Sequence, residues 1–377
     1  MYNKIAGNGI ADDTAAIQEL LDHAEETIYL KNGTYLISSP LKIKSNTHLS
    51  LAPNAVMKLA DGANCAIIEN ESLPQRGYDH NIIIEGGIWD GNNEHQVRGR
   101  PYPETCYEED YYYGIFMRFV GVKNFTIRNL TIKDPEAYAM LLCNAENFCV
   151  DRITFDFNML RPNMDGIHVQ GTTRFGRISN IHGATNDDMV ALNCDDGYVC
   201  EITRGVIENV VVDGLFCDNG FTAVRLLSCG SAMRNVTIRN IFGTYRLNVV
   251  SFTHYNIHPG EPIWFDNITL ENIYASKSSV GNITGRDFWD ESTMKPLIES
   301  SPLLWFAEGV SCGNVSISNI HRIENTVTLA PTIKIDKNVS INRLYLRDLT
   351  QQFVNCEAQP ILVNEGKVET IIQEQEF

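Results

Sequence analysis

Three acidic residues stand at matching points of two successive apolar segments. The segments read NMDGIHV and NDDMVALN, and they contain Asp165, Asp187 and Asp188. Hydrolysis of a glycosidic bond uses two cooperating carboxyl groups, one to protonate the leaving oxygen and one to activate water or attack the sugar. We therefore expect chemistry at these three acids, provided that the fold brings the two segments together.

A recurring phrase indicates how the segments are positioned. The phrase is Asn, then alternating apolar residues, then Asn and a further apolar residue, which is typical of short strands and not of helices. Copies begin at Asn124, Asn147, Asn209, Asn235, Asn267 and Asn314, with related copies at Asn81, Phe175 and Asn338. Intervals of roughly 20 to 50 residues between copies are typical of stacked repeats.

One such repeat cannot bury its apolar face, whereas a stack of repeats forms a continuous core. The pattern therefore predicts an all-β, single-stranded parallel β-helix, and right-handed because parallel crossovers prefer that hand. The recurrent Asn fits a turn, where it tolerates the left-handed region and can bond to its neighbours in the stack. A β-sandwich is the alternative, but sandwiches lack a recurring phrase of this kind.

The ends and the irregular stretches complete the predicted organisation. Residues 1–25 are expected to cap the solenoid with a helix that starts at Asp12 or Asp13 and Thr14. Residues 93–115, including three consecutive tyrosines at 111–113, and residues 276–306 are predicted to be loop insertions. Because the repeats run through nearly all of residues 1–377 without a linker, we expect one domain.

Composition excludes several classes of partner. The net charge of -17 argues against nucleic acid, which requires clustered basic residues.

No apolar run is long enough to span a bilayer, and the start of the chain lacks a signal-peptide pattern. This favours a cytoplasmic protein if the chain is complete and a secreted one if a leader was removed. The ten scattered cysteines give no zinc signature, and we expect neither a metal nor a cofactor.

The two acidic motifs, together with GNGIADDTAAIQ near the start and GGIWDGN from Gly86, resemble the family 28 glycoside hydrolases, the polygalacturonases, among the pectin-lyase-type β-helices. The specific part of the resemblance covers about 80 residues around the acids. It implies an inverting active site in which Asp187 is the general acid. Asp165 and Asp188 would then be the base side that activates water.

The sequence also departs from that family. The family's further histidine after the paired acids is missing between Asp188 and Arg225. The family's Arg-x-Lys motif is matched only by Arg225, since Leu227 stands in the lysine position. Losing that cation argues against galacturonate as the sugar, because a buried anion needs a partner. A neutral or differently charged sugar is then the expectation.

Strand spacing agrees with the proposed chemistry, with one condition. Asp187 and Asp188 follow Asp165 by about one repeat, so the acids are expected at the roughly 4.8 Å strand spacing of a parallel sheet. Adjacent residues of a regular strand face opposite sides, and Asp188 shares phase with Val190 and Leu192. Both acids can reach the surface only if a bulge or turn lies there; otherwise the acids are ordinary turn residues.

Further residues are candidates for binding the substrate: Asn163, His168, Arg225 and His254. Arg225 could bind a sugar or pair with Asp187 or Asp188, and His168 could touch substrate or be a satisfied surface histidine. Asp195 and Asp196 are interpreted as a turn, and Trp264 as a core or rim residue that could also stack on a sugar.

The predicted function is an inverting, exo-acting glycoside hydrolase acting on a carbohydrate. A polysaccharide lyase or uronate epimerase on the same fold is one alternative, because fold does not fix function. A non-catalytic sugar-binding solenoid is the other. The sequence leaves the sugar, the linkage and the oligomeric state open.

Overall fold

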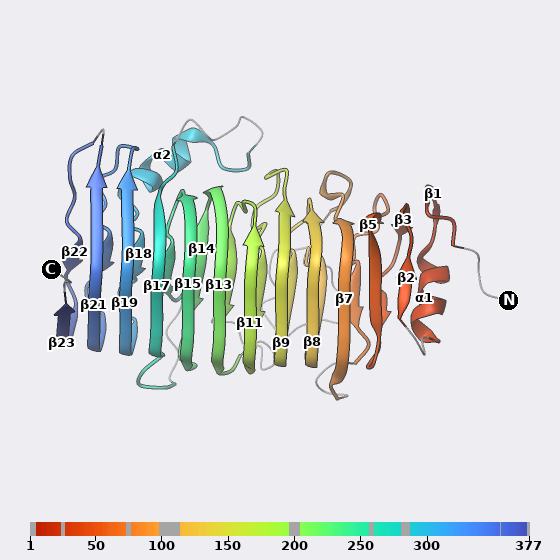
Figure 1. Cartoon of the computed structure of the whole chain (residues 1–377), viewed down its shortest axis with the longest axis horizontal. Coiled ribbons are helices and arrows are strands. Elements are labelled where there is room, and N and C mark those ends of the chain that lie inside the picture. The colour runs from red at the N-terminus through yellow and green to blue at the C-terminus, as the bar shows by residue number, and fades with distance from the viewer. Residues whose placement is uncertain are drawn as a thin grey trace.

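The computed structural model describes residues 5–23, 27–72, 77–97, 114–195, 204–255, 260–279, 287–354 and 356–374. Within these ranges the strands form one continuous parallel sheet that winds into a solenoid, with the two termini at opposite ends (Figure 1). The predicted all-β parallel β-helix is confirmed.

From β4 onward the chain alternates between short and long strands, and the strands of each kind stack into a series. The long-strand series consists of β5 (His48–Leu59), β7 (Asp79–Asp90), β8 (Met117–Lys133), β9 (Met140–Asp156), β11 (Thr173–His182), β13 (Ile207–Gly220), β15 (Met233–Tyr245), β17 (Phe265–Lys277), β19 (Ser311–Glu324), β21 (Ser340–Phe353) and β23 (Lys367–Glu374). The short-strand series consists of β4 (Leu41–Ile43), β6 (Ile68–Asn70), β10 (Ile167–Gln170), β12 (Asp188–Asn193), β14 (Thr222–Leu227), β16 (Val250–Thr253), β18 (Leu304–Phe306), β20 (Ile333–Ile335) and β22 (Leu362–Asn364). The first residues of β8 and β9 pair with β6 and β10 and so belong to this second series as well.

The recurrent asparagines make the corners of the coils. Asn81, Asn124 and Asn147 all have positive φ, as the phrase predicts. Their side chains bond to one another along the stack, with Asn147 Nδ2 donating to Asn124 Oδ1 at 2.6 Å and Asn124 Nδ2 to Asn81 Oδ1 at 2.9 Å. The corner residue of each coil therefore fixes its register on the next coil.

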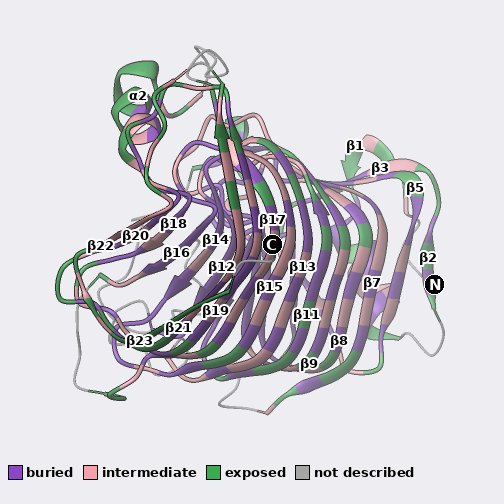
Figure 2. Ribbon diagram, turned by 60° about the vertical axis from the view of Figure 1, so that its left-hand side comes forward, coloured by how far each residue is buried: buried purple, intermediate pink, exposed green. Residues whose placement is uncertain are grey.

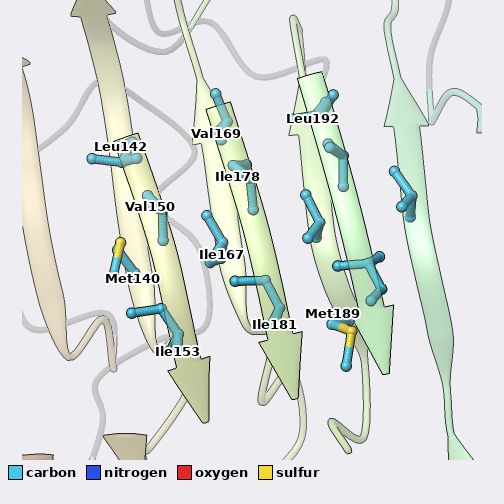
Figure 3. Packing of buried hydrophobic residues seen from close by; sticks show 14 of the residues in the cluster. Met140, Leu142, Val150, Ile153, Ile167, Val169, Ile178, Ile181, Met189 and Leu192 are labelled. Atoms are coloured by element: carbon cyan, nitrogen blue, oxygen red, sulfur yellow. The ribbon is translucent and has the colours of Figure 1, made fainter. Parts of the chain in front are cut away.

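The core runs along the axis of the solenoid between the two series. Figure 3 shows Leu142, Val169 and Leu192 on successive strands, and the strand register places them opposite one another. Their side chains are fully buried, like most inward-facing Ile, Val and Leu residues. Burial of these stacked apolar residues is the main stabilisation of each coil.

The N-terminal cap is present. After β1 (Asn8–Asp12), helix α1 (Thr14–Asp22) follows Asp13, its N-cap position. It buries Ile17 and Leu21 over the first coil, which contains β2 (Ile28–Leu30) and β3 (Gly33–Ile37). The Asp13 carboxylate accepts hydrogen bonds from the backbone of Ala6 and Gly7 instead of capping the helix, whereas Asp12 Oδ1 accepts from the Thr14 amide.

Both predicted insertions leave the same edge of the solenoid, in the turns that precede short strands. The first contains η1 (Asn93–His95), and its residues 98–113, with the three tyrosines, lie outside the described residues. The second contains α2 (Glu291–Ser300), which lies beyond the ends of β14, β16 and β18 (Figures 1 and 2). Its Met294 and Ile298 pack on Phe221 just before β14. None of the described helices is long and apolar enough to cross a bilayer.

Candidate active site

Asp165 and Asp188 occupy equivalent positions on adjacent coils. Ile167 of β10 lies opposite Val190 of β12, so the residues two positions earlier in each segment correspond. The Gly166 amide donates to the Asp188 carbonyl at 2.8 Å, which joins the two segments at the level of the acids. Adjacent short strands thus bring the two motifs together, as the sequence spacing predicts.

An irregularity at the start of β12 allows Asp188 to leave the core. Met189 and Val190 are consecutive, yet both belong to the hydrophobic core. The alternation of β12 is therefore shifted at its first residue, and Asp188 lies on the outer side with Ala191 and Asn193. Asp187 precedes the strand in a bend. Only Asp187 of the paired acids reaches the surface, where it is partly exposed; Asp188 is 2% exposed and Asp165 1%, so the expectation that both paired acids reach the surface is wrong.

Gly166 permits the close approach of the two coils. A Cβ at this position would lie 2.3 Å from the Met189 carbonyl oxygen and 2.5 Å from the Phe155 ring. A side chain at Gly166 would separate the strands that carry Asp165 and Asp188. The glycine of the NMDG motif therefore positions the acids although it has no chemical group of its own.

Asp187 is partly exposed and has its own set of contacts. Asn163 Nδ2 donates to Asp187 Oδ2 at 3.3 Å, and Thr185 Oγ1 donates to its carbonyl at 2.7 Å. Burial raises the pKa of Asp187, while Arg225 and the bond from Asn163 oppose that shift. A carboxyl with a raised pKa is suited to hold the proton that a general acid delivers.

Arg225 lies on β14, the strand that follows β12 in the short-strand series. Its Nε lies 2.8 Å from Asp188 Oδ2, and its Nη1 donates to the Tyr255 hydroxyl at 2.8 Å. Burial would lower the pKa of the guanidinium, but Asp188, Tyr255 and the other two acids hold it above its ordinary value. Of the two roles that the sequence left open for Arg225, the structure places it in the pair with Asp188.

His168 is buried, so the alternative of a satisfied surface histidine is wrong, while its contact with substrate stays a prediction. Its side chain is 1% exposed because it packs 4.1 Å from the Tyr138 ring, measured between centroids, under neighbouring coils. Its Nδ1 lies 3.5 Å from Asp165 Oδ2, and the Asn193 amide contacts Nε2. Burial, reinforced by Arg225, holds the pKa of His168 well below its ordinary value. A neutral imidazole that accepts at Nε2 carries its proton on Nδ1, facing Asp165.

Other candidates lie apart from the three acids. His254 follows β16, and its Nε2 lies 2.7 Å from the Glu308 carbonyl oxygen of the next coil. None of the contacts found in the described ranges joins it to an acid. Trp264 is a core residue against which His254 packs edge-on. Asp195 is buried and lies 3.1 Å from Arg204 Nε, and Asp196 is outside the described residues.

Two residues that the sequence did not single out hold the paired acids in place. The buried Asn186 accepts from the Met164 amide and donates to the carbonyls of Met159 and Arg161. Trp289, just before α2, donates from Nε1 to the Asn186 carbonyl at 2.8 Å. The second insertion is thus bonded directly to the residue that precedes Asp187.

Two arginines in turns that precede short strands are engaged in ion pairs with carboxylates. Arg161 Nε lies 3.0 Å from Glu136, and Arg246 lies 2.7 Å from Asp287 in a buried pair that also attaches the second insertion. Within the described ranges, no group of His, Cys, Asp and Glu side chains is arranged to hold a metal ion. The site is therefore a set of carboxyls and hydrogen-bonding groups on a β-helix.

These features define a parallel β-helix protein with an acidic site on its short-strand face. Residues 4–97 match the family model described as rhamnogalacturonase A/epimerase, pectate lyase-like. The chain is therefore similar to the pectin-lyase-like proteins and has weak similarity to a putative rhamnogalacturonase and a polygalacturonase, in line with the resemblance in the sequence.

Individual relatives are distant. A polygalacturonase of Medicago sativa is 26% identical over 210 residues, which cover 52% of this chain and 46% of the relative. The plasmin and fibronectin-binding protein A of Streptococcus pneumoniae is 27% identical over 210 residues, covering 48% and 28% of the two chains. The chain thus spans less than half the length of either relative.

Solved structures share the fold at low identity. A family 28 exopolygalacturonase of Yersinia enterocolitica superposes with a TM-score of 0.55 and 16% identity, covering 98% of this chain and 76% of that one. The mannuronan C-5 epimerase A-module of Azotobacter vinelandii, at 13% identity and a TM-score of 0.56, covers 97% of both chains. Hydrolases, epimerases and adhesins all occur among these similar proteins, so the fold alone does not define the reaction.

Proposed function

We propose that this protein is a glycoside hydrolase that cleaves its substrate with inversion of configuration. The observation that carries the proposal is the register of Asp165 with Asp188 on adjacent short strands, with Asp187 directly before Asp188. Inverting enzymes hold their two carboxyls roughly 6.5–9.5 Å apart, with a water between one of them and the sugar. Side chains that diverge from strands roughly 4.8 Å apart fit that separation.

The environments of the acids support different roles. Asp187, whose pKa burial raises, is the proposed general acid that protonates the leaving oxygen. Asp188 is paired with Arg225, and a cation beside a carboxylate favours its ionised form. Asp188 and Asp165 are therefore the proposed base side, which takes a proton from the attacking water.

The engagement of Arg225 favours a neutral sugar. Its Nε and Nη1 are directed at Asp188 and Tyr255, and Arg161 and Arg246 are paired with acids. A uronate carboxylate that bound Nε or Nη1 of Arg225 would have to displace one of these two contacts. The negative net charge of the protein also disfavours an anionic polymer. The insertion at α2, bonded to the acid motif through Trp289, supports an exo-acting mode because it lies at the edge of the site.

Two alternatives have specific support. Asp165 and Asp188 are only 1% and 2% exposed, which favours a binding protein without turnover, and one relative is named as a binding protein. The matching family model also includes epimerases, which would act at C5 of a uronate.

A product screen tests the proposal against both alternatives. Defined neutral and uronic oligosaccharides are incubated with wild type, Asp187→Asn and the control Asp156→Asn, whose carboxylate is exposed on the long-strand series. We expect new reducing ends from a neutral oligosaccharide with wild type and the control, none with Asp187→Asn, and no ultraviolet absorbance. Absorbance would indicate a lyase, an epimerised uronate an epimerase, and binding without turnover a binding protein.

A further inference from the structure

A second side-chain cluster lies on the same face as the acids, further toward the C-terminus. We propose that Trp305, Lys334 and Asp336 form a subsite that binds one pyranose unit of a neutral oligosaccharide whose cleaved bond lies at the acids. This subsite rests on the proposed function for the position of the bond, but its binding of sugar can be measured without any reaction.

The strand register places the cluster in line with the acid site. Arg225 lies opposite Ser251, which lies opposite Trp305, which lies opposite Lys334, on the consecutive strands β14, β16, β18 and β20. This row runs along the solenoid axis, across the strands. At roughly 4.8 Å per strand, Trp305 is about 10 Å from Arg225. A linear oligosaccharide along the row would meet successive strands with successive sugar units.

Trp305 points away from the core, and a hydrogen bond from its indole nitrogen fixes its orientation. Its neighbours Leu304 and Phe306 are fully buried in the core, whereas Trp305 is partly exposed. Its Nε1 donates to Asp336 Oδ2 at 2.7 Å. A partly exposed indole whose polar atom is already satisfied presents an apolar surface of fixed orientation, which suits the apolar face of a pyranose ring.

Lys334 and Asp336 supply hydrogen-bonding groups beside the ring. Lys334 Nζ lies 3.0 Å from Asp336 Oδ1, and the two side chains are 35% and 18% exposed. The ammonium has three donors, and this ion pair uses one of them. Because the pair is neutral as a whole, the cluster suits sugar hydroxyls better than a uronate carboxylate.

Within the row, only a small side chain lies between Arg225 and Trp305. Ser251, the residue of the row between Arg225 and Trp305, has a small side chain that is 3% exposed. It does not project between the two larger side chains. An oligosaccharide of two units would therefore occupy the acid site without contacting Trp305, and only longer ones would reach the subsite.

The test measures binding and turnover separately as a function of length. Neutral gluco-, galacto-, xylo- and rhamno-oligosaccharides of two to six units are titrated into Asp187→Asn by calorimetry, and their hydrolysis is measured with otherwise wild-type protein. Trp305→Ala is compared with Trp305→Tyr, which keeps an aromatic surface, and with Tyr29→Ala, which removes an exposed tyrosine from β2 near the N-terminal end.

We expect Trp305→Ala to weaken binding of the longer oligosaccharides, and raise their KM, by about tenfold while leaving the two-unit ligand unchanged. Trp305→Tyr should recover most of the affinity, and Tyr29→Ala should match the parent protein. Length-dependent binding without turnover would overturn the proposed hydrolase and retain the subsite. Two results would overturn the subsite. One is that Trp305→Ala and its parent bind and hydrolyse oligosaccharides of every length equally well. The other is that affinity does not depend on length in any of the sugar series.

Discussion

Nε of Arg225 lies 2.8 Å from Oδ2 of Asp188, and the two residues come from adjacent strands of the short-strand series. Asp188 is 3% exposed at its side chain and Arg225 18%. Removing one partner of such a pair leaves a buried charge without its counter-ion, which costs far more than the pair contributes in net stability.

We therefore predict that Arg225→Ala lowers the free energy of unfolding by about 3 kcal/mol. The double variant Arg225→Ala with Asp188→Asn should recover part of that loss, because the remaining side chain is neutral. Urea unfolding of the four proteins measures the coupling between the two residues. If the two single substitutions add in the double variant, the pair is not coupled and its role in the site is wrong.

Asp187→Asn should stabilise the protein at neutral pH. Burial raises the pKa of Asp187, so the folded state binds its proton more tightly than the unfolded state. The stability that the Asp187 carboxyl contributes is then lost as the pH rises above about 3.9, the pKa of this group in the unfolded state. We expect the variant to have the higher thermal midpoint at pH 7, with the difference from wild type narrowing toward pH 4. Asp156→Asn is the control, and a wild type more stable than the variant at pH 7 would contradict the assignment.

His168 should be neutral and should act through Asp165. Its Nδ1 faces Asp165 Oδ2, and Asn193 contacts Nε2. Nitrogen NMR of labelled histidines should show the Nδ1-protonated form of His168 from pH 8 to pH 5, with the exposed His95 as an internal reference. We further expect His168→Leu to lower kcat about tenfold with little change in KM. A doubly protonated ring at pH 6 would contradict the proposed positioning.

The structure also contains a buried lysine away from the acids. Lys277, on β17, donates from Nζ to the Leu247 carbonyl, and burial lowers its pKa to about 7, an effect that Arg322 adds to and Glu324 opposes. The unfolded state therefore holds more protons than the folded state between pH 7 and the ordinary value of about 10.4. Stability from this group rises with pH across that window and is lost as the pH falls toward 7.

We predict that wild type gains unfolding free energy between pH 7 and pH 9 relative to Lys277→Met, in which nothing titrates at this position. The exposed pair of Lys123 with Glu146 provides the control Lys123→Met, which should follow wild type. Parallel pH profiles for wild type and Lys277→Met would show that the lysine is charged in the folded state throughout.

The coils could be predicted from the sequence because their signals are local. The alternation of apolar residues and the Asn with positive φ lie within single repeats, as at Asn124 and Asn147. The register of Asp165 with Asp188 follows from the spacing of two neighbouring repeats. From the sequence, a bulge or turn near Asp188 is only a condition for exposing both acids, and only the structure shows that the consecutive Met189 and Val190 both belong to the core.

The remaining contacts of the site depend on residues far apart in the chain. Trp289 bonds to the Asn186 carbonyl across 103 residues, and no sequence pattern links the two. The burial of His168 results from Tyr138 and neighbouring coils. Strand alternation predicts which side of the strand a residue faces, but it does not predict whether other side chains cover that side. Whether Arg225 contacts Asp188 or Asp187 depends on the direction of the arginine side chain, which the sequence does not show.

The configuration of the released sugar tests the central claim most directly. Proton NMR would follow the first minutes of hydrolysis of the neutral oligosaccharide that the product screen identifies, before the anomers equilibrate. We predict that wild type releases the anomer opposite to that of the cleaved bond and that Asp187→Asn releases none. Release of the retained anomer, formation of an unsaturated product, or equal hydrolysis by Asp187→Asn would contradict an inverting hydrolase built on Asp165, Asp187 and Asp188.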